Sequence, residues 1–379
     1  MTRLGNWMAL QRKQSAAVAR YSISWFQDGI TRKGVLRLAT RIALWCLLTA
    51  LLSVGMGIRN EVTQYASVSL RYEPDISGKT AYAARQYSIE HADENPFWPT
   101  FWREERVSLS VEYAKADVDG IFFSGNAMLV WPARYLAGAA PGVTDGAGVA
   151  LSDSLAWTLF GSTDVVGMEV KLDEETRVIR GVFEGETALA LLSTRDEDTA
   201  QSWSAAELSA GPADATRADA ESYATASGLG KPDSILTSGA ASFANAMSLL
   251  PLLLMAAYGL ALCLAFLRRR PVAFRQGLFF LACLTLAFSL PTILETLPGW
   301  MIPTRWSDFA FWSELFSQAE DSLREFLSLT PRLRDVEMRL LLLKQAGIAL
   351  ASTCCALSAC FLWHRDTSSG GGAIGLRKK

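Results

Sequence analysis

The apolar residues of this chain gather into four long runs that charged segments separate. A helix that crosses the roughly 30 Å hydrocarbon core of a bilayer needs about 20 apolar residues. No run contains Asp, Glu, Lys or Arg, and the first reaches full length if residues 38–40 are added and Arg41 snorkels to the surface. Pro291 is expected to end or kink the third. The pattern therefore predicts four transmembrane helices, at residues 38–58, 246–267, 277–294 and 345–363.

The charges that flank these runs predict their direction. Residues 1–41, 268–276 and 364–379 carry 16 of the 36 Lys and Arg residues but only 2 of the 38 Asp and Glu residues. Short basic segments beside transmembrane helices stay in the cytoplasm. We therefore expect both termini to be cytoplasmic, with the tail at 364–379 and a short inner loop at 268–276. Residues 59–245 and 295–344 are expected outside.

The first apolar run is expected to be a retained span, because 41 residues precede it and no small-residue cleavage site follows. The leader at residues 1–37 mixes basic residues with tryptophan, phenylalanine and aliphatic side chains. This composition is typical of a helix that lies on the inner leaflet and contacts membrane lipids. A disordered basic tail is the alternative.

Residues 59–245 are long enough to bury a hydrophobic core of their own. A helix is expected at 154–160, with Ser152 or Asp153 as its N-cap and Gly161 as its stop. Residues 193–240, rich in Ala, Ser, Asp and Gly, form either a disordered linker or a strand at 203–208 followed by a helix at 216–227. The mixture predicts an α+β domain. Alternating apolar residues and short apolar runs favour strands at 106–114, 120–123, 127–131, 148–151, 168–172 and 177–183, the last two as a hairpin.

One stretch of this domain resembles a known family. Residues 148–185, GVALSDSLAWTLFGSTDVVGMEVKLDEETRVIRGVFEG, are similar to the signature of the extracytoplasmic core domain in MacB/FtsX-like ABC transporter permeases. Residues 119–123, Ser152, Leu155, Ala156 and Val178 also match. The main matches are a helix that ends in LFG, a D-x-x-G step and a G-V strand, at Leu159, Phe160, Gly161, Asp164, Gly167, Gly181 and Val182.

The resemblance implies an α-helical membrane protein with four transmembrane helices and an inserted α+β extracytoplasmic domain, in the plasma membrane of a prokaryote. It also implies a permease-like subunit that transmits motion to the outer domain and is not itself an enzyme. Its partners would be a separate ATPase subunit or a partner permease, in a homo- or heterodimer. The alternative is a membrane-anchored scaffold or sensor that uses the same domain to bind proteins and does not transport.

Two segments depart from the family pattern. The inner loop 268–276, RRRPVAFRQ, lacks the family's coupling-helix sequence, which argues against the conventional contact with an ATPase. Its basic side chains are the candidate partner contact: Arg268, Arg269, Arg270 and Arg275. The outer loop 295–344 is longer than in the family and carries a bulky apolar stripe at helical spacing. This amphipathic helix either packs under the outer domain or lies on the outer leaflet; its stripe is Phe309, Trp312, Phe316, Ala319, Leu323 and Phe326.

The composition argues against most other chemistry. All six cysteines fall in apolar runs, which excludes disulfides and cysteine metal sites from the outer domain. The two histidines, His91 and His364, are predicted on opposite sides of the membrane, and no nucleophile–base pair stands out. We therefore predict no enzyme activity, no cofactor and no metal. The basic segments flank the membrane, so no nucleic-acid partner is expected.

Two weaker patterns are interpreted as structural. Residues 77–80, SGKT, echo a phosphate-binding loop, but Glu73 stands where its first glycine belongs and the segment is predicted outside the cytoplasm. The acidic residues at 173–175 are expected to form a solvated turn; their spacing matches no known calcium loop, although calcium is the alternative.

Overall fold

A computed structural model describes residues 32–65, 67–94, 97–195, 198–210, 217–236, 239–267 and 327–371, together with scattered positions between 276 and 324. The helices are α2 (Arg32–Gln64), α3 (Gly78–Glu90), α4 (Ala127–Val130), α5 (Asp153–Phe160), α6 (Arg217–Ala226), α7 (Gly239–Leu267) and α10 (Leu333–Gly371), with a short 3-10 turn, η1 (Ala92–Glu94). The strands are β1 (Val68–Ser77), β2 (Phe97–Ser110), β3 (Lys115–Ser124), β4 (Tyr135–Gly138), β5 (Gly148–Ser152), β6 (Glu169–Leu172), β7 (Glu175–Phe183), β8 (Leu189–Ser193), β9 (Ser202–Ala210) and β10 (Ser234–Leu236).

The chain divides into two compact units. The helical unit comprises Met1–Met56, Met247–Leu267 and Ala346–Lys379, and the sheet unit comprises Gly57–Ala246 and Arg268–Gln345. Helix α10 begins in the sheet unit and continues without a break into the helical unit. The first turn of α10 therefore belongs to the sheet unit.

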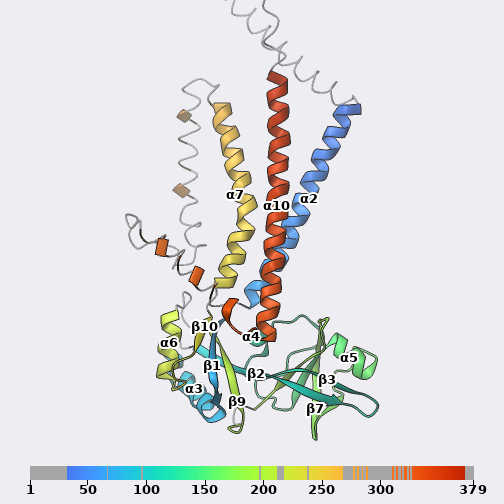
Figure 1. The fold of residues 1–379 in the computed structure, drawn as a ribbon, viewed down its shortest axis with the longest axis vertical. Helices are drawn as coiled ribbons and strands as arrows, with labels where there is room; N and C mark the ends of the chain where they lie inside the picture. Colours follow the sequence, from blue (N-terminus) through green and yellow to red (C-terminus); the bar gives the residue numbers. More distant parts are fainter. Residues whose placement is uncertain are drawn as a thin grey trace, which may run out of the picture. The chain divides into compact units, whose positions relative to one another are not determined.

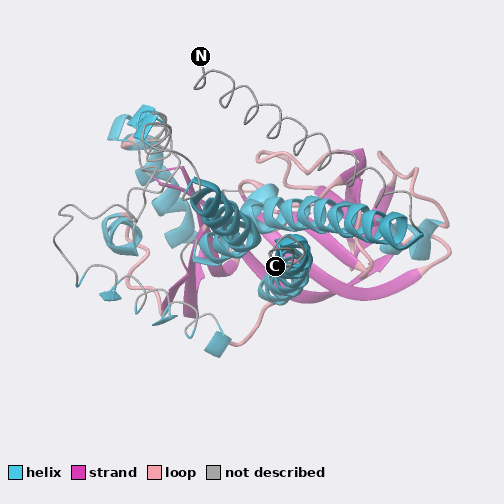
Figure 2. Ribbon diagram, turned by 90° about the horizontal axis from the view of Figure 1, so that it is seen from above, coloured by secondary structure: helices cyan, strands magenta, loops and turns pink. Residues whose placement is uncertain are grey.

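The ten described strands form one sheet. Their order is β10-β1-β9-β2-β3-β8-β5-β7-β4, and β6 pairs with β2 and β7. Most neighbours are antiparallel, but β3 pairs with β8 and β5 pairs with β7 in parallel. The long strands curve across the unit (Figure 2). Helices α3 and α6 lie beside β1 and β10, and α5 lies near β3 and β7 (Figure 1).

Both faces of the sheet are covered, so the unit has two hydrophobic cores. The larger core lies under α3, α5 and α6 and contains Leu70, Phe101 and Leu155. The smaller one lies on the opposite face, with Trp102 and Phe123 packed against residues of α4 and, at its edge, against the first residue of α10. Side chains of a strand alternate between the two faces of a sheet. Polar residues on the strand segments that both cores cover are therefore enclosed, as Ser69 and Arg71 of β1 are.

The predicted helix at 154–160 is confirmed as α5. Ser152 is its N-cap and accepts the backbone N–H of Leu155 at 3.3 Å. Gly161 is its C-cap, with a φ of 67° in the left-handed region that favours glycine. The predicted hairpin is confirmed as β6–β7, whose register pairs Leu172 with Glu175.

Other local predictions have mixed outcomes. The ordered alternative for 193–240 is confirmed where that segment is described: β9 corresponds to the predicted strand and α6 to the predicted helix. The strand predicted at 127–131 is wrong, because the Asn126 side chain caps a helical turn, α4, by accepting the N–H of Met128 at 3.0 Å. The strand predicted at 106–114 ends at Ser110 instead, and Tyr113 is 90% exposed, because the chain turns toward β3 there. The strand β2 extends backward to Phe97.

Helix α3 explains the SGKT sequence. Ser77 is its N-cap, whose hydroxyl accepts the N–H of Thr80 at 3.2 Å. A Cβ at Gly78 would lie 2.7 Å from the carbonyl oxygen of Asp198 and 2.9 Å from that of Gln201. The serine and glycine of this sequence thus serve a helix start packed against a loop, as the structural interpretation predicts.

Three described helices are long and apolar enough to cross a membrane, judged by length and composition. The qualifying segments are Leu38–Gln64 of α2, Phe243–Ala261 of α7 and Leu333–Phe361 of α10. Within the helical unit, Leu48 of α2 packs with Cys355 and Ala356 of α10, and Met255 of α7 joins them. Only scattered positions of the third predicted span, 277–294, are described, so the count of four remains a prediction.

Candidate functional site

Three neighbouring strands present polar side chains to the same buried face of the sheet. Strand β1 contributes Ser69 and Arg71, strand β9 contributes Glu207, and strand β2 contributes Trp102 and Glu104. The register aligns Ser69 with Glu207 and Arg71 with Ala205, which in turn pairs with Trp102. The apolar alternates Leu70 and Phe101 fill the larger core on the other face. The polar row therefore crosses strands β1, β9 and β2 on the face of the sheet where α10 begins.

Glu207 lies at the centre of this row and is fully buried. Its carboxylate accepts hydrogen bonds from the hydroxyls of Ser67 and Ser69 at 2.6 and 2.7 Å and from the indole N–H of Trp102 at 3.0 Å. Burial opposes its ionisation, but the nearby Arg334 and Arg71 together with the two serine hydroxyls outweigh burial and lower the pKa of Glu207. Glu207 is thus a buried carboxylate that keeps its charge.

Arg334, in the first turn of α10, is 1% exposed and provides the main countercharge. Its guanidinium lies 3.3 Å from the carboxylate of Glu207. The same group donates to backbone carbonyls of two other segments: Tyr65, directly after α2, at 3.2 Å, and Val130, in α4, at 3.0 Å. It also donates to the Ser67 hydroxyl at 2.9 Å and to the Leu129 carbonyl at 3.2 Å. One side chain therefore joins α10 to the end of α2, to α4 and to strand β9.

Asp335 and Arg71 form a second buried pair beside the first. Their closest side-chain nitrogen and oxygen are 2.8 Å apart, with both side chains at most 7% exposed. The Arg71 guanidinium lies 4.7 Å from the centre of the Trp102 ring, and that of Arg332 lies 5.5 Å from it. Arg332 also donates to the Ser204 hydroxyl of β9 at 2.7 Å. Burial lowers the pKa of Arg71, while Asp335 and Glu207 favour its charged form.

Glu104 completes the group at the start of α10. Burial raises the pKa of Glu104, and the backbone N–H groups of Leu333 and Arg334, in the first turn of the helix, partly offset this by favouring the ionised carboxylate. The first four N–H groups of a helix have no partner within it, and an acidic side chain there also interacts favourably with the helix dipole. We call this set the α10 anchor; it consists of Arg71, Trp102, Glu104, Glu207, Arg332, Arg334 and Asp335.

The α10 anchor is built to hold a position. Breaking a buried ion pair by removing one partner costs about 3–5 kcal/mol, because the other charge stays buried without compensation. The anchor contains no pair of a nucleophile and a histidine base, since the chain has only two histidines, His91 and His364. Among the described residues no three His, Cys, Asp or Glu side chains form a group that could hold a metal ion. This arrangement is therefore suited to fixing the start of α10 on the sheet.

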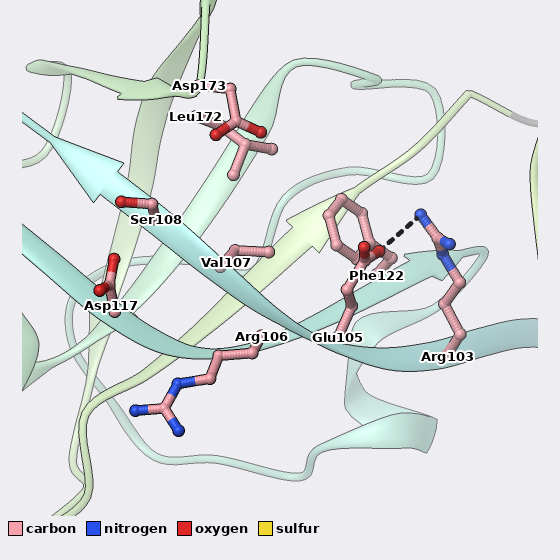
Figure 3. A pocket seen from close by; sticks show the side chains of 9 residues that line it. All are labelled: Arg103, Glu105, Arg106, Val107, Ser108, Asp117, Phe122, Leu172 and Asp173. Atoms are coloured by element: carbon pink, nitrogen blue, oxygen red, sulfur yellow. Dashed lines mark ion pairs between the residues drawn. The ribbon is translucent and has the colours of Figure 1, made fainter.

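An open pocket of about 450 Å³ lies elsewhere on the sheet, along β2 and β3 (Figure 3). Charged side chains of both signs line it, among them Arg103, Arg106, Asp117 and Asp173. Arg103 pairs with Glu105 at 3.1 Å and lies 4.7 Å from the centre of the Phe122 ring. These side chains therefore already satisfy one another in part, and the pocket shows no convergent set of groups for one ligand.

The structure places the predicted family-motif residues around α5 and β7. Leu159 and Val182 are buried in the larger core. Gly161 and Gly167 have positive φ angles of 67° and 88°. A Cβ at Gly181 would collide with the Ala139 carbonyl oxygen and with the Tyr135 ring. Phe160 packs against the larger core, and Asp164 donates its backbone N–H to Ser162. These positions serve the fold, and none belongs to the α10 anchor.

Other predicted site residues lie outside the described part of the chain. They are the four inner-loop arginines Arg268, Arg269, Arg270 and Arg275, the apolar stripe Phe309, Trp312, Phe316, Ala319, Leu323 and Phe326, and the leader up to residue 31. The expectations for them stay predictions.

The α10 anchor was not predicted from the sequence. A signal exists in β1, where Val68, Leu70 and Tyr72 alternate with Ser69 and Arg71. Such alternation is typical of a strand with one face in solvent. The structure instead buries both faces, and Ser69 and Arg71 are 1% and 5% exposed.

Comparison with known proteins gives a likeness of fold. Part of the chain is similar to the extracellular domain of the noncanonic ABC-type transporter YknZ from Gram-positive bacteria, with 11% identity, a TM-score of 0.34, and coverage of 42% of this chain and 90% of that one. Another similar structure is the periplasmic region of MacB from Actinobacillus actinomycetemcomitans, with 10% identity, a TM-score of 0.37, and coverage of 46% and 89%. No protein family and no curated protein matches the chain. TM-scores this low do not decide function, which must be argued from the site.

Proposed function

We propose that this chain is a permease-like membrane subunit of an ABC-type transport assembly, and that it transmits motion from membrane helices to an extracytoplasmic sheet domain. One observation carries the proposal. Helix α10 is long and apolar enough to cross a membrane, yet it begins with Arg334 and Asp335 buried in ion pairs on the sheet. A helix fixed in this way cannot shift at its start without moving the strands that hold it.

The energies support a stiff connection. Pulling Arg334 out would remove the main countercharge of the buried Glu207 carboxylate, at a cost of about 3–5 kcal/mol. The same guanidinium also binds the Tyr65 carbonyl at the end of α2. The start of α10 and the end of α2 therefore meet at the Arg334 side chain. A displacement of either helix near this point is passed to β9 and β1.

The proposed assembly has further parts that follow the sequence resemblance. The chain would cross the plasma membrane four times, with both termini in the cytoplasm, and work as a homo- or heterodimer. A separate ATPase subunit would supply the energy. Arg268, Arg269, Arg270 and Arg275, on the predicted inner loop, are the proposed contact with that ATPase or with a partner permease.

The first experiment is a pull-down of the intact chain from its native membrane in nanodiscs, with partners identified by mass spectrometry. The expected result is one ATPase in stoichiometric amount. Replacing the four inner-loop arginines by glutamine should abolish its recovery. The matched control replaces four basic residues of the predicted cytoplasmic tail: Arg365, Arg377, Lys378 and Lys379. Loss of the ATPase with both variants, or with neither, would contradict the assignment of the inner loop.

A second experiment tests transmission itself. The double substitution Arg334→Met and Glu207→Gln removes both charges of the central pair while it keeps similar side-chain volumes. We expect this variant to retain the ATPase but to lose the ATP-dependent change in distance between spin labels on the sheet domain of two subunits. An unchanged distance response in the variant would mean that the α10 anchor does not carry the motion.

A non-transporting scaffold or sensor is the second candidate function. Exposed apolar side chains at and after α5, namely Trp157, Val166 and Met168, favour it, because exposed apolar patches mark protein-binding surfaces. Under this function the pull-down should return envelope proteins without an ATPase. Substitution of Trp157 by serine should then remove those proteins.

A further inference from the structure

Strand β2 has an open edge between two neighbouring strands. On the edge opposite β3, strand β9 pairs with residues 97–102 and strand β6 pairs with Leu109 and Ser110. No described strand pairs with residues 103–108 on this edge, although the same residues pair with β3 on the other. At about 3.4 Å per residue, the gap is about 20 Å long. It therefore has the length of a short strand.

The main chain of β2 directs hydrogen-bonding groups into this gap. In an antiparallel ladder, successive residues bond alternately to one neighbouring strand and to the other. Val111, directly after β2, donates to the Ala114 carbonyl at 2.8 Å, so the alternate residues back along β2, such as Val107, bond to β3. The N–H and C=O groups of Glu104 and Arg106 therefore point away from β3. Unpaired groups of this kind are a template for a further strand.

The open pocket of about 450 Å³ lies at this gap (Figure 3). Its lining includes Arg106 and Ser108 from one face of β2 and Val107 from the other, so it is open around the edge of the strand. The Ser108 hydroxyl is buried and has no hydrogen-bond partner among the described residues. The side chains of the pocket do not converge on one small ligand, but the main chain offers a row of donors and acceptors.

We propose that this gap binds an extended segment of a partner protein, which enters the sheet as an additional strand between β9 and β6. The inference concerns the sheet unit alone and does not rest on the proposed ATPase partner. Strands β9 and β6 both run antiparallel to β2, so a segment that continues their line also runs antiparallel to it. Strand addition takes its affinity from main-chain hydrogen bonds and its specificity from alternate side chains.

The strands that border the gap exclude a second copy of β2 as the occupant. In that copy, β2 is paired with its own β9 and β6 on the same edge as the gap. Bringing the two β2 edges together would make these bordering strands collide. A segment in a loop or tail of another protein has no such neighbours and can bend away from the sheet at both ends.

The side chains beside the gap indicate what the segment should carry. Arg106 is exposed and forms no ion pair with another described residue, whereas Arg103 is paired with Glu105 at 3.1 Å. An acidic residue opposite Arg106 would complete a cross-strand pair of opposite charges. On the other face, Val107 and Leu172 are each 8% exposed and belong to the larger core. The residues on either side of the acidic one should therefore be apolar and β-branched.

The probe is the peptide threonine-valine-glutamate-valine-threonine, blocked at both ends and labelled through a flexible linker. Its binding to the full chain in nanodiscs is measured by fluorescence anisotropy. Methylating the glutamate nitrogen, which would face Arg106, should weaken binding about tenfold, because it removes a main-chain hydrogen bond and leaves its acceptor unpaired. Methylating a valine nitrogen, which would point away from β2, is the matched control and should leave the affinity nearly unchanged. Equal affinities of the two methylated peptides would contradict strand addition.

A charge reversal tests the register. Arg106→Glu should weaken binding of the probe about threefold and should strengthen binding of a peptide with lysine in place of glutamate. Arg134→Glu is the matched control, because the Arg134 side chain is 81% exposed outside the gap, and it should change neither affinity. If the Arg106→Glu variant keeps the preference for the acidic peptide, the assigned register is wrong.

Hydrogen exchange identifies what fills the gap. In the full chain without the probe, the amides of Glu104 and Arg106 should exchange about tenfold faster than that of Val107, because only the last is bonded to β3. Saturating probe should remove this difference. Protection before the probe is added would mean that this chain or a second copy covers the edge, and would overturn the proposal. Failure of the probe to bind at millimolar concentration would also overturn it, because the charged side chains would then only guard the edge.

Discussion

Removing the central arginine of the α10 anchor should destabilise the protein far more than removing an exposed one. In Arg334→Met, Glu207 would keep the hydroxyls of Ser67 and Ser69 and the Trp102 indole, but its nearest remaining cation would be Arg71 at 3.9 Å. The backbone carbonyls that Arg334 serves would also lose their donor. A buried charge left in this state costs about 3–5 kcal/mol.

This energy corresponds to a large thermal shift. For a domain of 150–250 residues, 1 kcal/mol moves the Tm by about 2–4 °C, so Arg334→Met should lower it by roughly 6–20 °C. The matched control is Arg134→Met, which breaks a surface pair with Glu184 at 3.6 Å whose side chains are 81% and 60% exposed. Exposed pairs contribute about 0–1 kcal/mol, so the control should stay within a few degrees of wild type.

A double-mutant cycle separates the ion pair from the rest of the packing. Adding Glu207→Gln to Arg334→Met removes the stranded charge, so the double variant should be less destabilised than the two single variants summed, by about 1–3 kcal/mol. The assay is reversible denaturation of the full chain in micelles, followed by tryptophan fluorescence. Two results would refute the reasoning: strict additivity of the two substitutions, or a loss below about 1 kcal/mol for Arg334→Met.

Three further expectations can be measured with the same unfolding assay. Gly181→Ala should cost about 3 kcal/mol, because its Cβ would meet the fixed carbonyl of Ala139, whereas Gly161→Ala should cost only about 1 kcal/mol, because its surroundings are open and only the left-handed backbone is strained. Equal losses at the two glycines would contradict this. Ser152→Ala should cost about 1–2 kcal/mol, since its hydroxyl accepts two backbone N–H groups at 3.3 and 3.0 Å; a neutral result would show that the cap is dispensable. Glu207 has a lowered pKa, so its stabilisation is present above about pH 4.3 and is lost as the pH falls through its folded value. Glu207→Gln should therefore be less stable than wild type near neutrality and approach it in acid, and a constant difference would refute the assignment.

The sequence alone was sufficient to predict features that depend on the length of an apolar run or on interactions between neighbouring residues. The long apolar runs predict membrane helices because a bilayer requires that length, and three described helices meet the requirement. Helix α5 was predictable because Ser152 and Gly161 act on their own neighbours, one as an acceptor for free N–H groups and the other through a positive φ. The β6–β7 hairpin follows from two short runs with a tight turn between them.

Predictions from local sequence patterns were wrong where contacts with distant residues determine the structure. Residues 127–131 are apolar enough for a strand, but the Asn126 side chain starts a helical turn whose carbonyls then receive Arg334 from more than 200 positions away. Ser69 and Arg71 have the alternation that is typical of a strand with one face in solvent. They belong to a buried network because the start of α10 packs on that face.

The α10 anchor therefore belongs to the tertiary structure. The sequence around a single arginine or glutamate does not show whether its charge is exposed or buried. Its state depends on burial and on opposite charges within a few ångströms, which strands β1, β2 and β9 and helix α10 supply only after they have paired. The sequence determined that long apolar helices flank an α+β domain; the packing of distant segments decided which charges hold the start of α10 on the sheet.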